Sequence, residues 1–363
     1  MTMGQARWEE FELHCAAAVR ESQRADGCIT LDQIKETLLQ GAIYCGVPAA
    51  NTGFKIFVGV LKAQGLAIDP APLTAGCRVV THHTFSVPQL RIALQGVATG
   101  VPVVLSHALG LDLQMWDDLA DQLGDQHPVL RYDQRGHGGS ATPAGPYSMD
   151  ELVDDAARVL REWNVGPVVW VGLSMGGMVG QGLAIRHSEL LCGLVLANTT
   201  AGYPEPAQTG WAQRINSVES GGMPAVVDRV IERYLHAGLR AAQPPTVARV
   251  RDTLLRCDPA GYVASCHAVA NVNWWAQLGA IKAPTLIIAG ALDLGAPPAM
   301  AQAMQAAIPA ARLVLLAEAS HLSVAEQPAE FAALARGFLA QLIEVTAPVA
   351  PVASAITAAP SVD

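Results

Sequence analysis

The chain has 363 residues, of which 51% are apolar and 15% are charged, and its formal net charge is −9. This length allows two domains, and the apolar fraction excludes a mainly disordered chain because enough apolar surface is available to offset the entropy of folding. The acidic balance argues against a general nucleic-acid binder, which needs clustered Lys and Arg to contact phosphates.

The sequence contains neither a membrane span nor a visible secretion signal. No run reaches the roughly 18 apolar residues that a span requires, and Glu9, Glu10 and Glu12 stand where a signal peptide needs its apolar core. The seven cysteines form no Cys-x-x-Cys pair, which favours reduced thiols over disulfides or a metal site. We therefore expect a cytoplasmic protein with no membrane or nucleic-acid partner.

The first part of the chain differs from the rest in its pattern of apolar, Pro and Gly residues. Apolar periodicity predicts helices over residues 1–68, and a Pro- and Gly-punctuated stretch predicts a linker over 69–84. Residues 344–363 are rich in Ala, Pro and Val, which predicts a disordered tail.

Residues 85–343 alternate short apolar strands with helices. This alternation predicts an α/β domain with a mostly parallel sheet covered on both faces. Residues 204–276 interrupt it with helical segments alone, which we interpret as a lid. The predicted strands are 90–94, 101–105, 129–132, 168–171, 190–197, 285–289 and 312–316, and the predicted helices outside the lid are 115–123, 150–163 (opened by Ser148), 175–187, 298–307 and 328–343.

Ser174 is the candidate nucleophile. It lies in Gly172-Leu173-Ser174-Met175-Gly176, a Gly-x-Ser-x-Gly pattern between a buried strand and a helix. Such a turn is too tight for side chains at the glycine positions, and it pushes the serine hydroxyl outward above the sheet. The strand and helix at the right places favour a nucleophile over a chance glycine-rich turn.

A serine hydroxyl needs a base to remove its proton and an acid to orient the base. Of the four histidines that follow Ser174, only His321 comes after a strand near the C-terminus. Asp293 ends an earlier strand, whereas the other position for the acid carries Asn198, which has no carboxylate. Asp293 could instead cap a turn, but its place in the order Ser-Asp-His favours catalysis.

The tetrahedral intermediate of such a reaction needs two hydrogen-bond donors. The expected donors are the backbone N–H groups of Met175, directly after the serine, and of Leu109, in the loop after strand 101–105. His107 lies in that loop, but because it precedes the serine we favour a scaffold or pocket-lining role. Asp133 and Arg135 more often lock such a polar loop than touch substrate.

Residues 85–343 resemble the 3-oxoadipate enol-lactonase family of the α/β-hydrolase superfamily. The matching segments are Leu105–Asp112, Met115-Trp116, Arg131–Asp133, Arg135–Ser140, Gly172–Gly177, Asp258–Tyr262, Ser320–Ser323 and Glu326–Pro328. The sequence departs from the family at His107-Ala108 and at Leu294-Gly295-Ala296, where small polar residues and Thr-Pro are commoner. The resemblance implies the α/β-hydrolase fold and hydrolysis of the enol-lactone to 3-oxoadipate in the β-ketoadipate pathway of aromatic catabolism.

The N-terminal segment is similar to part of the 4-carboxymuconolactone decarboxylase family. The matching residues are Trp8–Glu10, His14, Ile34–Glu36 and Gln40–Asn51. The N-terminal helices of that family are missing, so a remnant or docking module is favoured over an active decarboxylase.

The resemblance implies a small lactone substrate, no metal and no organic cofactor. A free carboxylate on the substrate calls for an arginine, which is suited to bidentate binding. Trp274 and Trp275 could line the substrate pocket or pack the lid on the body. The lid arginines that could bind the carboxylate are Arg214, Arg229, Arg233, Arg249, Arg251 and Arg256.

Three alternatives remain open at this point. The chain could be another carboxylesterase or perhydrolase of the same fold. It could also be bifunctional, with decarboxylase activity in its first 68 residues. The third possibility is a non-catalytic ligand-binding protein on a hydrolase scaffold. A homo-oligomer is possible.

Overall fold

The computed structural model describes residues 79–84, 86–97, 100–242 and 244–346. The chain divides into two compact units, Met1–Gly76 and Cys77–Asp363, and the first of them lies outside the described residues. The predicted helical segment 1–68, its resemblance to the decarboxylases, the start of the linker and the tail beyond residue 346 therefore stay predictions.

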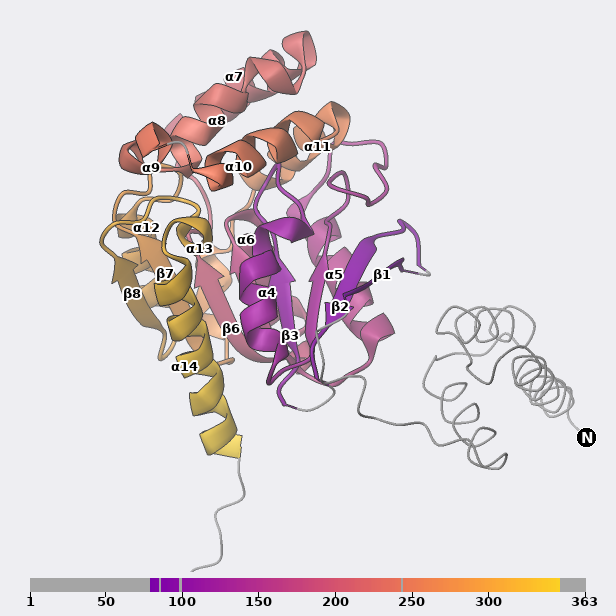
Figure 1. The fold of residues 1–363 in the computed structure, drawn as a ribbon, viewed down its shortest axis with the longest axis vertical. Helices are drawn as coiled ribbons and strands as arrows, with labels where there is room; N and C mark the ends of the chain where they lie inside the picture. Colours follow the sequence, from indigo (N-terminus) through magenta and orange to yellow (C-terminus); the bar gives the residue numbers. More distant parts are fainter. Residues whose placement is uncertain (1–78, 85, 98–99, 243, 347–363) are drawn as a thin grey trace, which may run out of the picture. The chain divides into compact units, whose positions relative to one another are not determined.

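The described part is an eight-stranded sheet with helices on both faces (Figure 1). The strands are β1 (Val80–His83), β2 (Arg91–Gln95), β3 (Val103–Ser106), β4 (Val129–Tyr132), β5 (Val168–Leu173), β6 (Leu191–Ala197), β7 (Thr285–Gly290) and β8 (Arg312–Leu316). The α-helices are α4 (Asp117–Gly124), α5 (Met149–Trp163), α6 (Met175–Arg186), α7 (Pro206–Gly221), α8 (Val227–Tyr234), α9 (Ala237–Ala242), α10 (Pro245–Arg256), α11 (Pro259–Ala270), α12 (Pro298–Ala307), α13 (Ser323–Glu326) and α14 (Pro328–Thr346), and the 3₁₀ helices are η2 (Leu113–Trp116), η3 (Ser188–Leu190), η4 (Met223–Ala225) and η5 (Trp275–Ala280).

The strand order is β1-β2-β4-β3-β5-β6-β7-β8. Strand β2 runs antiparallel to both β1 and β4, and every other neighbouring pair of the sheet, from β4-β3 to β7-β8, is parallel. Strand β3 lies between β4 and β5. From β3 the chain first adds β4 on one side and then β5 to β8 on the other side, so the direction in which strands are added reverses at β3. In open α/β sheets, ligands bind outside the carboxyl ends of the strands at such a switch point, which is where the loops after β3 and β5 lie.

Local sequence accounts for the elements that position the site. Strand β5 is buried along its whole length, as its apolar, β-branched sequence predicts. Helix α5 begins with a capping box in which Ser148 and Glu151 each accept a hydrogen bond from the other's backbone, and it ends at Asn164 in the left-handed conformation. Helices α4 and α14 cover one face of the sheet and α5, α6 and α12 the other (Figure 1).

Two predicted boundaries were wrong. Strand β1 lies inside the stretch 69–84 that we expected to be a linker, and it pairs antiparallel with β2 at the edge of the sheet. An edge strand of four residues has one partner, so its sequence carries little of the apolar pattern by which central strands are recognised. Helix α14 runs to Thr346, three residues into the predicted tail.

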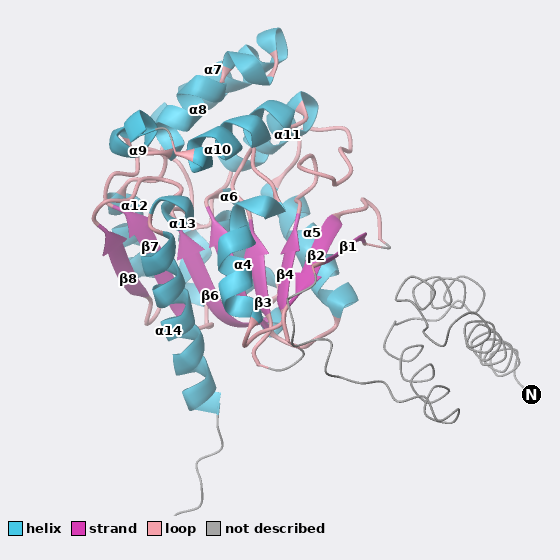
Figure 2. Cartoon of the chain, viewed as in Figure 1, coloured by secondary structure: helices cyan, strands magenta, loops and turns pink. Residues whose placement is uncertain are grey.

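The helical insertion is confirmed. Helices α7 to α11 lie between β6 and β7 in the chain and over one end of the sheet (Figures 1 and 2). Within it the structure describes no strand, only an isolated bridge between Gly202 and Asn273 where the insertion leaves and rejoins the body. None of the helices in the described ranges combines the length and the apolar character needed to cross a bilayer.

Candidate active site

Ser174 lies at the tight turn between strand β5 and helix α6. Its backbone has φ 56° and ψ −115°, a conformation that L residues rarely adopt and that costs on the order of 1–3 kcal/mol. The Ser174 N–H donates to the carbonyl of Ala197 (2.9 Å), and the hydroxyl of Thr199 donates to the carbonyl of Ser174 (2.7 Å). The serine is therefore held at the carboxyl end of β5, where 6% of its surface is exposed.

The two glycines of the motif are required by contact distances. A Cβ at Gly172 would lie 2.2 Å from the carbonyl oxygen of Gly176, and a Cβ at Gly176 would lie 2.1 Å from the carbonyl oxygen of Ser106. These distances are far below van der Waals contact, so neither position accepts a side chain without moving backbone.

Asp293 and His321 form a buried pair at the ends of β7 and β8. The Nδ1 atom of His321 lies 2.9 Å from one carboxylate oxygen of Asp293 and 3.0 Å from the other. His321 is 3% exposed and Asp293 is 2% exposed. Because Nδ1–H donates to the carboxylate, Nε2 of the neutral imidazole keeps its lone pair and can accept a proton.

The end of β6 connects Ser174 to this pair. Asn198, directly after Ala197, donates from Nδ2 to Asp293 (3.0 Å) and to the carbonyl of Ser320 (2.8 Å). No hydrogen bond joins the Ser174 hydroxyl to His321 in the part of the chain that the structure describes. Nucleophile–base hydrogen bonds are often long in unliganded enzymes and tighten when substrate binds.

The surroundings of Asp293 keep its carboxylate ionised. Burial by itself would raise the pKa of Asp293, but the charge and hydrogen bond of His321, the Ala296 amide and Asn198 together hold it below its usual value. One carboxylate oxygen accepts from the amides of Gly295 (2.6 Å) and Ala296 (3.0 Å). The Leu-Gly-Ala sequence after Asp293, which departs from the family pattern, thus supplies two donors to this carboxylate.

The amide of Met175 is free to bind a ligand. Its N–H donates no hydrogen bond to any described residue. The carbonyl of the same peptide unit, that of Ser174, is held by the amides of Gly177 (2.9 Å) and Met178 (3.0 Å) and by Thr199. Since C=O and N–H of a trans peptide point in opposite directions, these bonds fix the direction of the Met175 N–H.

Leu109 has the second free amide, in the loop after β3. The neighbouring amides are all occupied: Ala108 N–H lies 3.4 Å from the sulfur of Met115, Gly110 N–H donates to His137 (2.9 Å), and Leu111 N–H donates to Ala108 (3.1 Å). Leu109 N–H donates to no described residue. The carbonyl of His107 accepts from Gly176 N–H (3.1 Å), which ties this loop to the start of α6 next to Met175.

His107 and His137 are buried scaffold residues. Nε2 of His107 accepts from the backbone N–H of Gln134 (2.8 Å), so its proton is on Nδ1, which donates to the carbonyl of Ala108 (2.8 Å). Nδ1 of His137 donates to the carbonyl of Arg135 (3.1 Å). Burial lowers the pKa of His107 to about 4, and burial together with the nearby His107 lowers the pKa of His137 to about 3. Both rings are therefore neutral at pH 7.

The polar loop after β4 is locked as the sequence predicts. The carboxylate of Asp133 accepts from the amides of Leu113 (2.7 Å) and Gly139 (2.8 Å). Arg135 forms ion pairs with Asp155 (2.5 Å) and Glu151 (2.9 Å) on α5. Neither residue is left with a free charge to offer a substrate.

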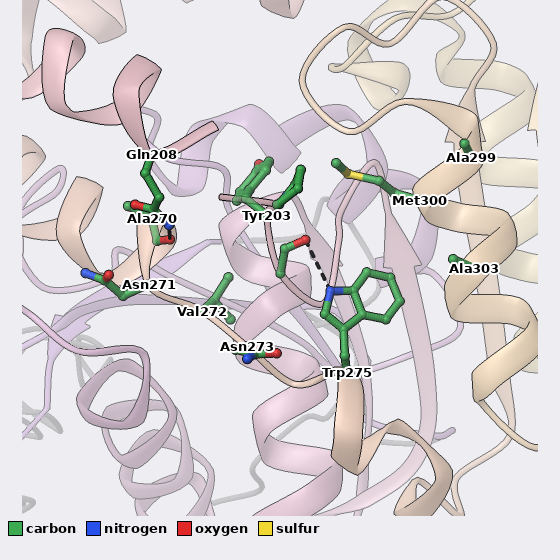
Figure 3. A pocket seen from close by; sticks show the side chains of 12 residues that line it. Tyr203, Gln208, Ala270, Asn271, Val272, Asn273, Trp275, Ala299, Met300 and Ala303 are labelled. Atoms are coloured by element: carbon green, nitrogen blue, oxygen red, sulfur yellow. Dashed lines mark hydrogen bonds between the residues drawn. The ribbon is translucent and has the colours of Figure 1, made fainter. Parts of the chain in front are cut away.

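The two tryptophans differ in their surroundings. Trp274 is buried, and its Nε1 donates to the carbonyl of Met178 (3.1 Å), which packs the return of the lid onto α6. Trp275 is half-buried, donates to Gly202 (3.4 Å), and lines a cavity of about 550 Å³ with Tyr203 and Met300 (Figure 3). Ser174 does not line this cavity, and the part of the two indoles in substrate binding stays a prediction.

Arg214 is the lid arginine with the most suitable surroundings for an anionic ligand. Its guanidinium lies over the ring of Trp211, 5.0 Å from the centroid, and it has no carboxylate partner among the described residues. It interacts electrostatically with Tyr262 and Tyr234. Arg251 pairs with Asp228, Arg249 and Arg256 contact threonines on their own helix, and Arg229 and Arg233 are exposed.

Two residues that the sequence analysis did not assign to the site contact it directly. Asn198 appeared there only as a position without a carboxylate, yet it holds both Asp293 and the residue before His321. The ring of Tyr234, at the end of α8, stacks on the imidazole of His321 with centroids 5.0 Å apart. The place of Asn198 at a strand end could have indicated its role, whereas no local pattern marks Tyr234.

Comparison with known proteins gives a consistent result. The profile of the Alpha/beta hydrolase family matches residues 103–334. 3-Oxoadipate enol-lactonase 2 of Acinetobacter baylyi is 35% identical over 242 residues, which are 67% of this chain and 90% of that protein. 3-Oxoadipate enol-lactonase 1 of the same organism is 28% identical over 250 residues, or 69% of this chain and 92% of that protein.

Two solved structures of hydrolases are similar to this chain in fold and sequence. The enol-lactonase from Burkholderia xenovorans LB400 is 33% identical with a TM-score of 0.69, and the match covers 71% of this chain and all of that one. A thermophilic esterase from Thermogutta terrifontis is 29% identical with a TM-score of 0.67, over 73% of this chain and 99% of that one. With a parallel sheet, a strained serine after β5 and a family match over residues 103–334, the chain belongs to the alpha/beta hydrolase family.

Proposed function

We propose that this chain hydrolyses 3-oxoadipate enol-lactone to 3-oxoadipate, as a step of the β-ketoadipate pathway. The observation that carries this proposal is the buried Asp293–His321 pair, which is linked through the end of β6 to a serine in the strained turn after β5. The likeness to two enol-lactonases of Acinetobacter baylyi and to that of Burkholderia xenovorans supports the choice of substrate.

The reaction begins with attack of Ser174 on the ring carbonyl. His321 accepts the hydroxyl proton at Nε2, and Asp293 holds the imidazole tautomer and stabilises the imidazolium. The free amides of Leu109 and Met175 donate to the oxyanion. The ring C–O bond breaks, and the imidazolium of His321 gives its proton to the leaving enolate oxygen, so that an enol stays attached to the acyl chain. The neutral His321 then takes a proton from water, which attacks the acyl carbonyl, and returns this proton to Ser174 as the acyl-enzyme bond breaks. The enol tautomerises to the ketone of 3-oxoadipate.

Arg214 is our candidate for binding the free carboxylate of the lactone. It is a partly buried cation without an anionic partner among the described residues, and it interacts electrostatically with Tyr234, which packs against His321. A carboxylate would supply the partner that it lacks, and hydrogen bonds to charged groups contribute about 1.5–3 kcal/mol.

The decisive experiment is an assay of the full-length chain on the enol-lactone, monitored by loss of ultraviolet absorbance. Turnover should fall by several orders of magnitude in Ser174→Ala. Ser217→Ala is a matched control, because that exposed hydroxyl bonds only to its own helix α7, and it should retain full activity. Undiminished turnover in folded Ser174→Ala would refute the mechanism.

The role of Arg214 is tested separately with two substrates. Arg214→Met should raise KM for the anionic lactone by about 10- to 100-fold, while hydrolysis of the uncharged ester p-nitrophenyl acetate stays near its normal rate. Arg229→Met, which removes an exposed cation from α8, serves as the control. An equal loss of activity on the lactone and on the uncharged ester would show that Arg214 does not bind the substrate carboxylate.

A carboxylesterase acting on open-chain esters is the second candidate. The 29% identity to the Thermogutta esterase favours it, and the Ser174, His321 and Asp293 chemistry would be unchanged. A kcat/KM for simple esters that exceeds that for the enol-lactone would select this candidate instead.

A further inference from the structure

Tyr234 contacts both ends of the candidate machinery from the lid. Its hydroxyl donates to the carbonyl of Leu109 (2.7 Å), its ring stacks on His321, and its own carbonyl accepts from the amide of Leu322 (2.9 Å). The residue is 2% exposed. One lid side chain therefore joins the loop that carries a free amide to the loop that carries the imidazole.

The contact with Leu109 fixes the orientation of a peptide unit. Leu109 C=O and Gly110 N–H belong to one planar, trans unit. Tyr234 binds the carbonyl end of this unit, and Nε2 of His137 accepts from its N–H end (2.9 Å). Rotation of this unit would break two buried hydrogen bonds, so its orientation is fixed.

The preceding peptide unit carries the free amide. Its carbonyl, that of Ala108, accepts from Nδ1 of His107 (2.8 Å) and from the amide of Leu111 (3.1 Å). Its N–H is that of Leu109, which points the opposite way. Of the four polar groups on the two units that flank the Leu109 Cα, three are therefore held and one is free to meet a ligand.

The contacts of the same lid segment show that its position is set by the imidazole loop. His236 N–H donates to the carboxylate of Glu326 (2.7 Å), and the other oxygen of that carboxylate accepts from the amide of Ser320 (2.6 Å). Together with the Tyr234–Leu322 bond, these contacts attach the end of α8 on both sides of His321. This attachment and the bond of the Tyr234 hydroxyl to Leu109 therefore belong to the same lid segment.

We propose that Tyr234 is a positioning residue, which orients the Leu109 amide toward the oxyanion. Because Tyr234 belongs to the lid, the orientation of this amide depends on the lid being packed against the loop that carries His321. The inference rests on the proposed function, since it assigns the Leu109 amide to the oxyanion. It does not depend on the substrate, because any ester that Ser174 attacks develops the same charge.

Tyr234→Phe tests the proposal, since it removes the hydroxyl and keeps the ring on His321. The expected result is a fall in kcat of about tenfold with KM changed by less than about twofold, because the ground-state carbonyl gains less from the amide than the oxyanion does. An arylboronic acid, which forms a tetrahedral adduct with the serine, should bind about tenfold more weakly. The substrate is p-nitrophenyl acetate, and fluorophosphonate titration counts the competent sites.

Tyr147→Phe is the matched control. Tyr147 is equally buried, and its hydroxyl also donates to a backbone carbonyl, that of Pro143, at 2.7 Å. It should lose similar stability and keep its kcat and boronate affinity. Unchanged kcat and boronate affinity in Tyr234→Phe, a rise in KM alone, or an equal loss in Tyr147→Phe would overturn the inference. Esterase activity that survives Ser174→Ala would instead overturn the proposed function.

Discussion

The nucleophile half of the site (residues 106–110 and 172–177) and its acid–base half (Asn198, residues 293–296 and 320–326) are held by different kinds of interaction. In the nucleophile half, the turn at residues 172–177 is held mainly by hydrogen bonds between backbone groups, and its glycines are required because a Cβ would strike a carbonyl oxygen. In the acid–base half, side chains far apart in the sequence meet, as Asn198 does with Asp293 and Ser320. Backbone sterics therefore define the serine turn of the first half, and contacts between side chains distant in the sequence define the second half.

Among the variants that change one half of the site, Asp293→Asn in the acid–base half should lower kcat the most. The amide has nearly the same shape but cannot accept in the same way from Nδ1–H, so the imidazole takes the wrong tautomer and kcat should fall by about 10⁴-fold. Steady-state kinetics with thermal melting as a folding check would measure it. Asp258→Asn, at the N-cap of α11, makes the same change outside the site and should keep normal kcat. A loss below tenfold in Asp293→Asn would show that the orienting acid lies elsewhere.

Acid should weaken the nucleophile half through two buried histidines, His107 within it and His137, which binds the amide of its Gly110. The pKa values of His107 and His137 are about 4 and about 3, below the ordinary 6.5. As pH falls below 6.5 the unfolded chain takes up protons that the folded chain does not, so the free energy of unfolding decreases until the folded values are reached. Between pH 6.5 and 5 the loss should be about 2 kcal/mol for each histidine.

Urea unfolding at a series of pH values measures this loss. In His137→Gln, a residue that does not titrate replaces one of the two, so roughly half of the pH dependence should disappear. Equal stability of the original chain at pH 7 and pH 5 would contradict the neutral buried pair.

Asn198→Ala tests whether the contacts of Asn198 hold the acid–base half in place. It removes the donor to Asp293 and Ser320 and the acceptor for Ser323, so kcat should fall by about 10- to 100-fold, as expected for a lost charge-assisted bond. Steady-state kinetics on p-nitrophenyl acetate, with thermal melting as a folding check, would measure this loss.

A control for backbone strain is available within the chain. Asn198 has φ 46°, and Asn164 at the end of α5 has φ 51°, so replacing either by alanine incurs a similar left-handed penalty. Asn164→Ala should therefore lose stability without a change in kcat. If both variants lose activity alike, Asn198 acts through folding alone.

The smallest effect is expected for Trp274→Phe. The change removes the hydrogen bond to Met178 (3.1 Å) and should lower the free energy of unfolding by about 1 kcal/mol. KM and kcat should stay within twofold, because this buried indole bonds to the backbone of α6 and to none of the candidate catalytic residues. A rise in KM of more than twofold would indicate that Trp274 contacts the substrate.

The sequence predicted most of the sheet because central strands are buried on both faces. Strand β4 has the predicted bounds, and β5, β6 and β7 differ from them by at most two residues. The failure at β1 has the complementary reason, since an exposed edge strand needs no apolar pattern. Ser174, Asp293 and His321 could be selected because each follows a strand in an order that the fold restricts.

What the sequence by itself determined is the set of groups whose roles follow from local backbone geometry: the serine between two obligatory glycines, the amide that follows it, and the acid and base at strand ends. Only the tertiary structure decided which residues hold them. Asn198, Glu326 and Tyr234 act on partners 90 to 125 positions away, and a hydrogen bond at such a separation leaves no periodicity in the chain. The same reason explains why Arg214 could be singled out among the seven lid arginines only from its surroundings.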